Sequence, residues 1–193
     1  MSNLSATGFG AENTQVVNEF NATGVLCAPF EVFLYDSVFQ VLGPNNTVLE
    51  TVIPDPDGLV RAVAFLRVLH PQKLDGDDLK FLRSALGLKA VELAKRLGCS
   101  AEHLSRLESG VKVLQPQSEQ HVRTLTVVMA NSATKAKDLT LAEFSEQLIG
   151  LFDSIKPCRS IDEEPLKIEL SRVPCSEFDL DSKGLWDRPI KVA

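Results

Sequence analysis

The segment Lys89–Gly110 constrains the fold of this chain most, because it has the pattern of two short amphipathic helices joined by a tight corner. Its apolar residues recur at close to helical spacing. Gly98 can adopt the positive φ that ends a helix, and the Ser100 hydroxyl can cap the free amide groups of the next helix. The predicted buried positions are Val91, Leu93, Ala94, Leu97, Leu104 and Leu107.

The second predicted helix, Ala101–Ser109, has one apolar and one polar face and ends at Gly110. Two helices of this kind, one bracing the other, are typical of a helix-turn-helix, which places its second helix in a DNA groove. An ordinary helical hairpin is the alternative interpretation. The side chains predicted to point outward from the second helix are Ala101, Glu102, His103, Ser105 and Arg106.

The segment resembles the Cro/CI-type (Xre) helix-turn-helix family over roughly residues 74–129. The resemblance implies that Arg83 and Glu108 form a partly buried structural ion pair. It also implies a phosphate contact at the first position of the bracing helix, where family members often carry Gln and this chain has Ala90, so the contact is weakened or moves to Lys89. The matching residues are Leu79–Arg83, Leu88, Leu93, Ala94, Leu97, Gly98, Ser100, Leu104–Arg106, Glu108 and Gly110.

The predicted recognition helix carries the residue types that read DNA. The guanidinium of Arg106 can bond guanine O6 and N7 together, and Glu102 can accept a hydrogen bond from a cytosine amine. His103 can donate to a base or a phosphate, and short serines suit phosphate contacts. The full set of predicted DNA-binding residues is Lys89, Ala90, Ser100, Ala101, Glu102, His103, Ser105, Arg106 and Lys112.

The charge of the chain supports this reading only when it is examined locally. The net charge of −6 over 193 residues argues against a nucleic-acid partner. Residues 72–123, however, hold nine Lys and Arg against seven Asp and Glu, a net +2. The rest of the chain holds eleven against nineteen, a net −8. The acidic load therefore lies outside the predicted DNA-binding segment.

Other features exclude several classes of protein. No stretch is apolar for about 18 residues, so no membrane span is expected, and the N-terminus lacks the pattern of a signal peptide. Four scattered cysteines form no Cys-x-x-Cys pair, which argues against structural zinc and suits reduced thiols in a cytoplasm. No phosphate-binding, nucleophile or metal-ligand motif is present. We therefore expect a cytoplasmic protein that is not an enzyme, with no catalytic residue, metal or cofactor.

The remaining patterns predict an α+β fold, in which a small N-terminal β-hairpin plus helix precedes an all-α helix-turn-helix domain and a C-terminal extension. Residues 1–24 are expected to be a flexible arm. Residues 25–70 are expected to form a ββα unit that can mediate dimerisation, since a lone hairpin is marginal. The unit comprises strands at Phe30–Val41 and Thr47–Ile53, a turn at 43–46, and a helix at Gly58–Leu69 capped by Asp57 with Leu59, Ala62, Val63 and Leu66 buried.

Residues 71–130 are expected to form the DNA-binding domain, and residues 131–193 a C-terminal helix and extended tail. The first helix of the domain spans Asp75–Leu86, and its last begins near Pro116 with Val122, Leu125, Val128 and Met129 on its apolar face. Residues 131–138 read as a polar linker and Thr140–Phe152 as a helix whose apolar stripe serves as core or dimer seam. A strand is expected at Leu166–Leu170, and Trp186 stands alone in a tail that orders against the body or a partner protein.

These patterns favour a sequence-specific transcriptional regulator, a homodimeric repressor that binds double-stranded DNA. A two-fold dimer reads a palindrome with half-sites about 34 Å apart or a multiple of that. The alternative is an antitoxin-like protein that neutralises a partner and autoregulates its own operon. The layout is similar to that of MqsA-type antitoxins, but their zinc-binding cysteines are missing here.

Overall fold

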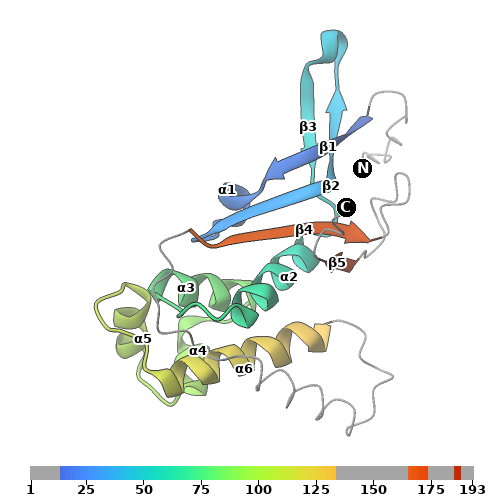
Figure 1. Ribbon diagram of the computed structural model, residues 1–193. Helices are drawn as coiled ribbons and strands as arrows, with labels where there is room; N and C mark the ends of the chain where they lie inside the picture. The colour runs from blue at the N-terminus through green and yellow to red at the C-terminus, as the bar shows by residue number, and fades with distance from the viewer. Residues whose placement is uncertain (1–13, 134–164, 174–184, 188–193) are drawn as a thin grey trace, which may run out of the picture.

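The computed structural model describes residues 14–133, 165–173 and 185–187, which form one β-sheet and a set of helices (Figure 1). The expected mixture of a sheet and a helical region is confirmed. The elements in chain order are β1 (Thr14–Asn21), α1 (Thr23–Leu26), β2 (Glu31–Leu42), the 3₁₀ turn η2 (Pro44–Asn46), β3 (Val48–Val52), α2 (Pro56–Leu69), α3 (Gly76–Ala85), α4 (Ala90–Arg96), α5 (Ala101–Glu108), α6 (Pro116–Ala133), β4 (Lys167–Val173) and β5 (Leu185–Asp187).

The long strand β2 organises the sheet, which has the order β1-β2-β4-β5. β1 pairs with β2 in the antiparallel sense along one edge. On the other edge, the first half of β2 pairs in parallel with β4, and the second half forms the predicted hairpin with β3. The two halves meet at Asp36, where φ is 49°, and at Ser37, whose Oγ accepts a hydrogen bond from the Arg172 amide at 2.8 Å. The hairpin projects away from the helices (Figure 1).

The two ends of the chain contribute strands to the sheet. The predicted flexible arm over residues 1–24 is wrong from Thr14 onward, because residues 14–21 form β1 and Val17 and Phe20 pack against the core. The predicted strand near Leu166–Leu170 is present as β4, and it pairs with β2, so this segment orders against the body, which is one of the two expected alternatives. Both strands depend on pairing with β2, a long-range contact that local composition does not report.

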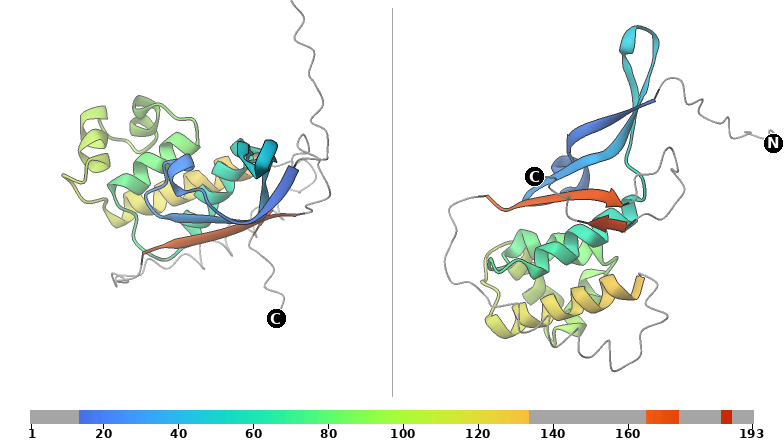
Figure 2. Two further views of the ribbon diagram at one scale, coloured as in Figure 1. Left: turned by 90° about the horizontal axis from the view of Figure 1, so that it is seen from above. Right: turned by 45° about the vertical axis from the view of Figure 1, so that its right-hand side comes forward.

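Helix α2 lies between the sheet and the helix-turn-helix segment (Figures 1 and 2). It contacts β4 and β5 on one side and α3 and α6 on the other. Its cap is Asp55, whose Oδ1 accepts a hydrogen bond from the Gly58 amide at 3.1 Å, rather than the predicted Asp57. Trp186 does not stand alone: it is buried, and its indole N–H donates to the Asp55 carbonyl at 3.3 Å. The buried side chains between α2 and the sheet are Val32, Leu34, Leu59, Val63, Ala64, Ile168, Leu170 and Trp186.

Four buried charged residues connect α2 to the helical domain, and we call Arg67, Asp78, Glu119 and Arg123 the arginine joint. Arg67 on α2 donates from Nε to Asp78 Oδ1 on α3 at 2.7 Å. Arg123 on α6 donates from Nη2 to Glu119 Oε1 at 2.8 Å. Burial raises the pKa of Asp78 and lowers that of Arg123, and hydrogen bonds from the partner oppose the shift in each case.

The arginine joint also satisfies the backbone of the chain that links the two regions. Arg123 donates to the carbonyls of Val68, His70 and Gln72 at 2.6 to 2.7 Å. Arg67 donates to the carbonyls of Gln72 and Lys73 at 3.1 and 3.0 Å. A buried carbonyl without a partner is costly, so these bonds hold the segment after α2 in place.

The last described helix differs from its predicted boundaries. α6 begins at Pro116 as expected but continues through Ala133, so the predicted linker is wrong over residues 131–133. Val122 is buried as predicted, while Leu125, Val128 and Met129 are half-buried beside buried Val127 and Ala130. The predicted helix at 140–152 lies outside the described residues. No helix within the described ranges is long and apolar enough to cross a membrane.

Candidate nucleic-acid interface

The first helix of the segment, α3, begins as its sequence predicts. Asp75 is its N-cap and accepts a hydrogen bond from the Asp78 amide at 2.8 Å, while Asp78 Oδ2 accepts from the Asp75 amide at 3.0 Å. This reciprocal pair is a capping box, which satisfies two amide groups that the helix leaves unpaired. Leu79 and Leu82 are buried, and α3 contacts α5, which in turn contacts α4.

The corner between α4 and α5 has the predicted geometry. Gly98 has φ of +67°, and Ser100 Oγ accepts a hydrogen bond from the His103 amide at 3.1 Å as the N-cap of α5. The predicted core contacts Leu93, Ala94, Leu104 and Leu107 are buried. Val91 is 68% exposed, so its assignment to the buried face was wrong.

A glycine that the sequence analysis passed over fixes the far end of α5. A Cβ atom on Gly76 would lie 2.4 Å from the Leu107 carbonyl oxygen, which is closer than real Cβ contacts. The first turn of α3 and the last turn of α5 therefore touch backbone to backbone. Such a close approach requires glycine and holds α5 in one position on α3.

The predicted ion pair between Arg83 and Glu108 is present. Arg83 Nε lies 2.6 Å from Glu108 Oε1 and Nη2 lies 3.2 Å from Oε2, with side-chain exposures of 19% and 13%. The hydrogen bond to Glu108 raises the pKa of Arg83. A third bond runs from Arg83 Nη1 to the Leu88 carbonyl at 3.2 Å. The pair connects α3 to α5. Because both side chains are largely buried in this contact, we interpret them as structural and not as base readers.

The outer face of α5 presents a polar surface to solvent. Ala101, Glu102, Ser105 and Arg106 are all exposed. Arg106 Nη2 lies 2.6 Å from Glu102 Oε1, and the two side chains are 53% and 75% exposed. Glu102 and Arg106 are predicted as separate base readers, but their i, i+4 spacing is also the local signal for an ion pair on one helix.

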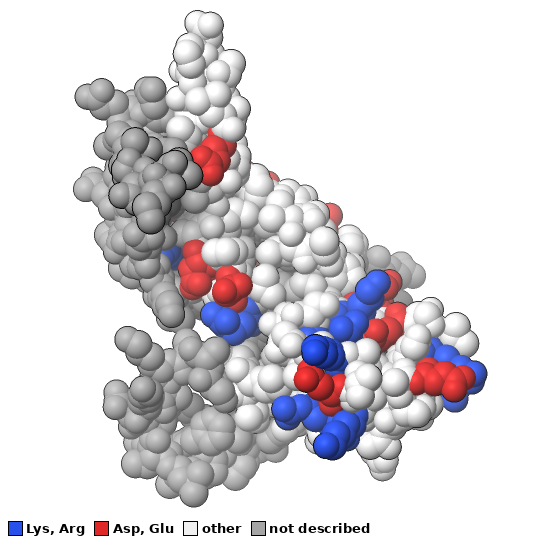
Figure 3. All heavy atoms as spheres, turned by 180° about the vertical axis from the view of Figure 1, so that it is seen from behind, with Lys and Arg blue, Asp and Glu red and all other residues white. Residues whose placement is uncertain are grey.

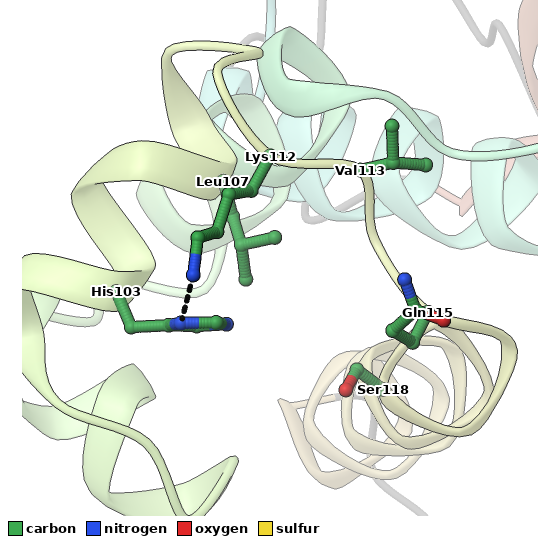
Figure 4. Close-up of a pocket in the computed structure, with 6 residues that line it drawn as sticks. All are labelled: His103, Leu107, Lys112, Val113, Gln115 and Ser118. Atoms are coloured by element: carbon green, nitrogen blue, oxygen red, sulfur yellow. Dashed lines mark hydrogen bonds between the residues drawn. The ribbon is translucent and has the colours of Figure 1, made fainter.

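The remaining predicted residues lie around the two ends of this surface. His103 is half-buried, and its Nδ1 lies 3.5 Å from Lys112 Nζ in the loop after α5. These two side chains point toward each other at the mouth of a pocket of about 230 Å³ between α5 and the start of α6 (Figure 4). Lys89 is exposed at the N-terminus of α4, next to half-buried Ala90. The pocket is lined by His103, Leu107, Lys112, Val113, Gln115 and Ser118.

Charges of both signs are interleaved over the helical half of the molecule in the view of Figure 3, rather than gathered into one basic patch. Acidic and basic side chains nearly balance in residues 72–123, so the net charge of that segment is only +2. Across the described residues, no three His, Cys, Asp or Glu side chains are placed to hold a metal ion. The chemistry that the surface offers is therefore hydrogen bonding and charge, from α5 and the loop that follows it.

Comparison with known proteins agrees with this geometry. Residues 76–128 match the family model of a helix-turn-helix domain, which covers α3 through most of α6. No curated protein and no solved structure matches the chain. Residues 76–128 thus match a helix-turn-helix domain in both sequence and geometry, and α2 and the arginine joint connect this segment to the five-stranded sheet.

Proposed function

We propose that this chain is a sequence-specific transcriptional regulator, a homodimeric repressor that inserts α5 into the major groove of a palindromic operator. The observation that carries the proposal is the polar outer face of α5, which is exposed while Leu104 and Leu107 anchor the helix from behind. A helix that is fixed on one side and polar on the other meets the steric requirement for groove insertion.

Arg106 is the proposed reader of guanine. Its Nη2 donates to Glu102 Oε1 at 2.6 Å, and the side chain is 53% exposed, so a base edge can reach the guanidinium. An exposed ion pair contributes roughly 0–1 kcal/mol, whereas a bidentate contact to guanine gives about 1–3 kcal/mol of discrimination. Arg106 therefore gains more by bonding a guanine edge than it loses by releasing Glu102, which favours the complex with DNA. Glu102, once released, is placed to accept from a cytosine amine.

The residues at the ends of α5 are proposed to bind phosphates and so fix its register. Ser100 and Ala101 open the helix, where the amide groups and the helix dipole favour an anion. Lys112 and His103 flank its other side, and Lys89 with Ala90 opens α4. Ser105 lies on the exposed face beside Arg106 and suits a close base or phosphate contact. Such contacts position a protein without specifying sequence.

Dimer formation follows from the size of the reading surface. One recognition helix contacts too few base pairs for useful specificity, and a two-fold dimer doubles the site. A dimer bound at an operator would block polymerase, which is why we propose repression. The modest net charge of the segment requires that base contacts, rather than charge alone, contribute much of the affinity.

A gel shift with genomic fragments at fixed salt tests the proposal. We expect a discrete complex with a few fragments, lost when Arg106 and His103 are both replaced by Ala. The matched control replaces Lys167 and Glu169 with Ala, since both lie on β4 in the sheet. The absence of any specific complex, or a complex that the Arg106/His103 variant retains in full, would contradict the proposal.

A further inference from the structure

The hairpin arm, which we define as Val38–Ile53, is the most exposed apolar feature of the sheet. Val48 is 50% exposed and Leu49 is 67% exposed. The arm projects beyond the rest of the molecule, on the side away from the helices (Figures 1 and 2). Large apolar side chains on a protruding element commonly mark a protein–protein contact.

The arm is almost free of charge, in contrast to the rest of the surface. Glu50 is the only charged residue between Val38 and Ile53. Figure 3 shows the end of the arm without Lys, Arg, Asp or Glu, while the helical half carries both signs. Two copies of a chain with net charge −6 repel one another. Because the hairpin arm carries a single charged residue, two copies that meet through their arms repel one another least.

The edge of β3 is open to a partner through its side chains rather than through its backbone. Among the described strands, β3 pairs only with β2, and it contains no Lys or Pro. Its one irregularity is a bulge, because Val48 and Glu50 pair with Leu42 and Val41 and leave Leu49 unpaired. A bulge twists an edge and interrupts a continuous ladder. A partner would therefore contact the Val48 and Leu49 side chains instead of extending the sheet.

We propose that the hairpin arm is a self-association surface whose occupant is the hairpin arm of a second copy of this chain. In a two-fold contact, residues near the axis meet their own counterparts. Leu49 and Val48 can do so with mutual burial of apolar surface. Two Glu50 carboxylates placed directly opposite one another would be destabilising, so the axis lies toward Val48 and Leu49.

This inference rests on the dimer of the proposed function and identifies the element that forms it. It needs no DNA, so the two can fail separately. Sedimentation velocity of the full chain over a concentration series is the test. We expect a reversible dimer, and we expect Leu49→Lys to raise its dissociation constant by more than about tenfold, since it places like charges at the axis.

The matched control is Val25→Lys, because Val25 on α1 is 63% exposed but lies outside the arm. We expect this variant to remain as dimeric as the wild type, and the Arg106/His103 double variant to remain dimeric although it fails to bind DNA. A second readout is an inter-chain disulfide formed by Leu49→Cys but not by Val25→Cys, both in a chain with exposed Cys27 replaced by Ser.

Two results would overturn the inference. One is a wild type that stays monomeric across the concentration series, which would mean that the arm does not bind a second copy of this chain. The other is a Leu49→Lys variant that stays as dimeric as the wild type, which would place the interface elsewhere. Neither result bears on whether α5 binds DNA, which the gel shift decides.

Discussion

The arginine joint and the outer face of α5 use the same chemistry, arginine paired with carboxylate, in opposite surroundings. Arg67 and Arg123 are 2% and 1% exposed and also bond backbone carbonyls, whereas Arg106 is 53% exposed and is paired to one carboxylate. Burial makes the joint costly to break, because removing one member leaves a buried charge without its ion-pair partner. The exposed Glu102–Arg106 pair costs little free energy to break. A surface whose side chains must exchange one partner for another requires such weak pairs.

The largest effect is expected at the joint. Arg123→Met removes the guanidinium that pairs with buried Glu119 and donates to the carbonyls of Val68, His70 and Gln72. We expect it to lower the free energy of unfolding by about 3–5 kcal/mol, measured by urea titration. The matched control, Arg96→Met on the exposed face of α4, should change it by less than about 0.5 kcal/mol. An equal loss of unfolding free energy in Arg123→Met and Arg96→Met would show that burial does not distinguish the arginine joint from exposed arginines.

A smaller effect is expected at the half-buried pair, which lies between the two extremes. A double-mutant cycle with Arg83→Ala and Glu108→Ala should give a coupling free energy of about 1–3 kcal/mol from urea unfolding. The pair joins α3 to α5, so both single variants should also weaken DNA binding. A coupling near zero would mean that the 2.6 Å contact contributes no more than an exposed pair.

Lys112 tests the phosphate contacts of the reading surface. Because a neutralised phosphate releases counterions, Lys112→Ala should reduce the slope of log affinity against log salt by about 1. The loss should be equal for operator and unrelated duplexes, and it should leave unfolding unchanged. Lys167→Ala, on the sheet, is the control and should leave the slope as it is. An unaltered slope in the Lys112 variant would remove this residue from the interface.

The smallest effect is expected when the exposed pair is opened. Glu102→Ala should change the free energy of unfolding by no more than about 0.5 kcal/mol, because both side chains are solvated. A loss as large as that of Arg123→Met would erase the contrast between the two regions.

The helix-turn-helix could be predicted because its signals are local. The Gly98 turn, the Ser100 cap and the Leu104 and Leu107 contacts all lie within one short segment and appear as expected. The Arg83–Glu108 pair came from the family resemblance rather than from spacing. The exposed DNA-reading roles remain predictions.

The sheet could be predicted only in part, because its pairings join distant segments. The β2–β3 hairpin follows from a local turn, and β4 is predicted as a strand but without its pairing partner. The polar composition of residues 1–24 predicts a flexible arm and does not indicate β1. Glu119 and Arg123 have the local i, i+4 spacing of a helical ion pair. Their burial could not be predicted, because the carbonyls that Arg123 and Arg67 bond lie in the segment after α2, and Asp78 lies on α3. Gly76 was missed for the same reason.

The central claim is that the exposed face of α5 reads bases through Arg106. The most direct test compares wild type and Arg106→Ala at fixed salt on an operator identified by the gel shift and on duplexes with each of its base pairs replaced in turn. We predict that the variant loses discrimination at one G·C pair in each half-site, by about 1–3 kcal/mol, and keeps it elsewhere. An equal loss on every duplex, or no loss at all, would contradict the account.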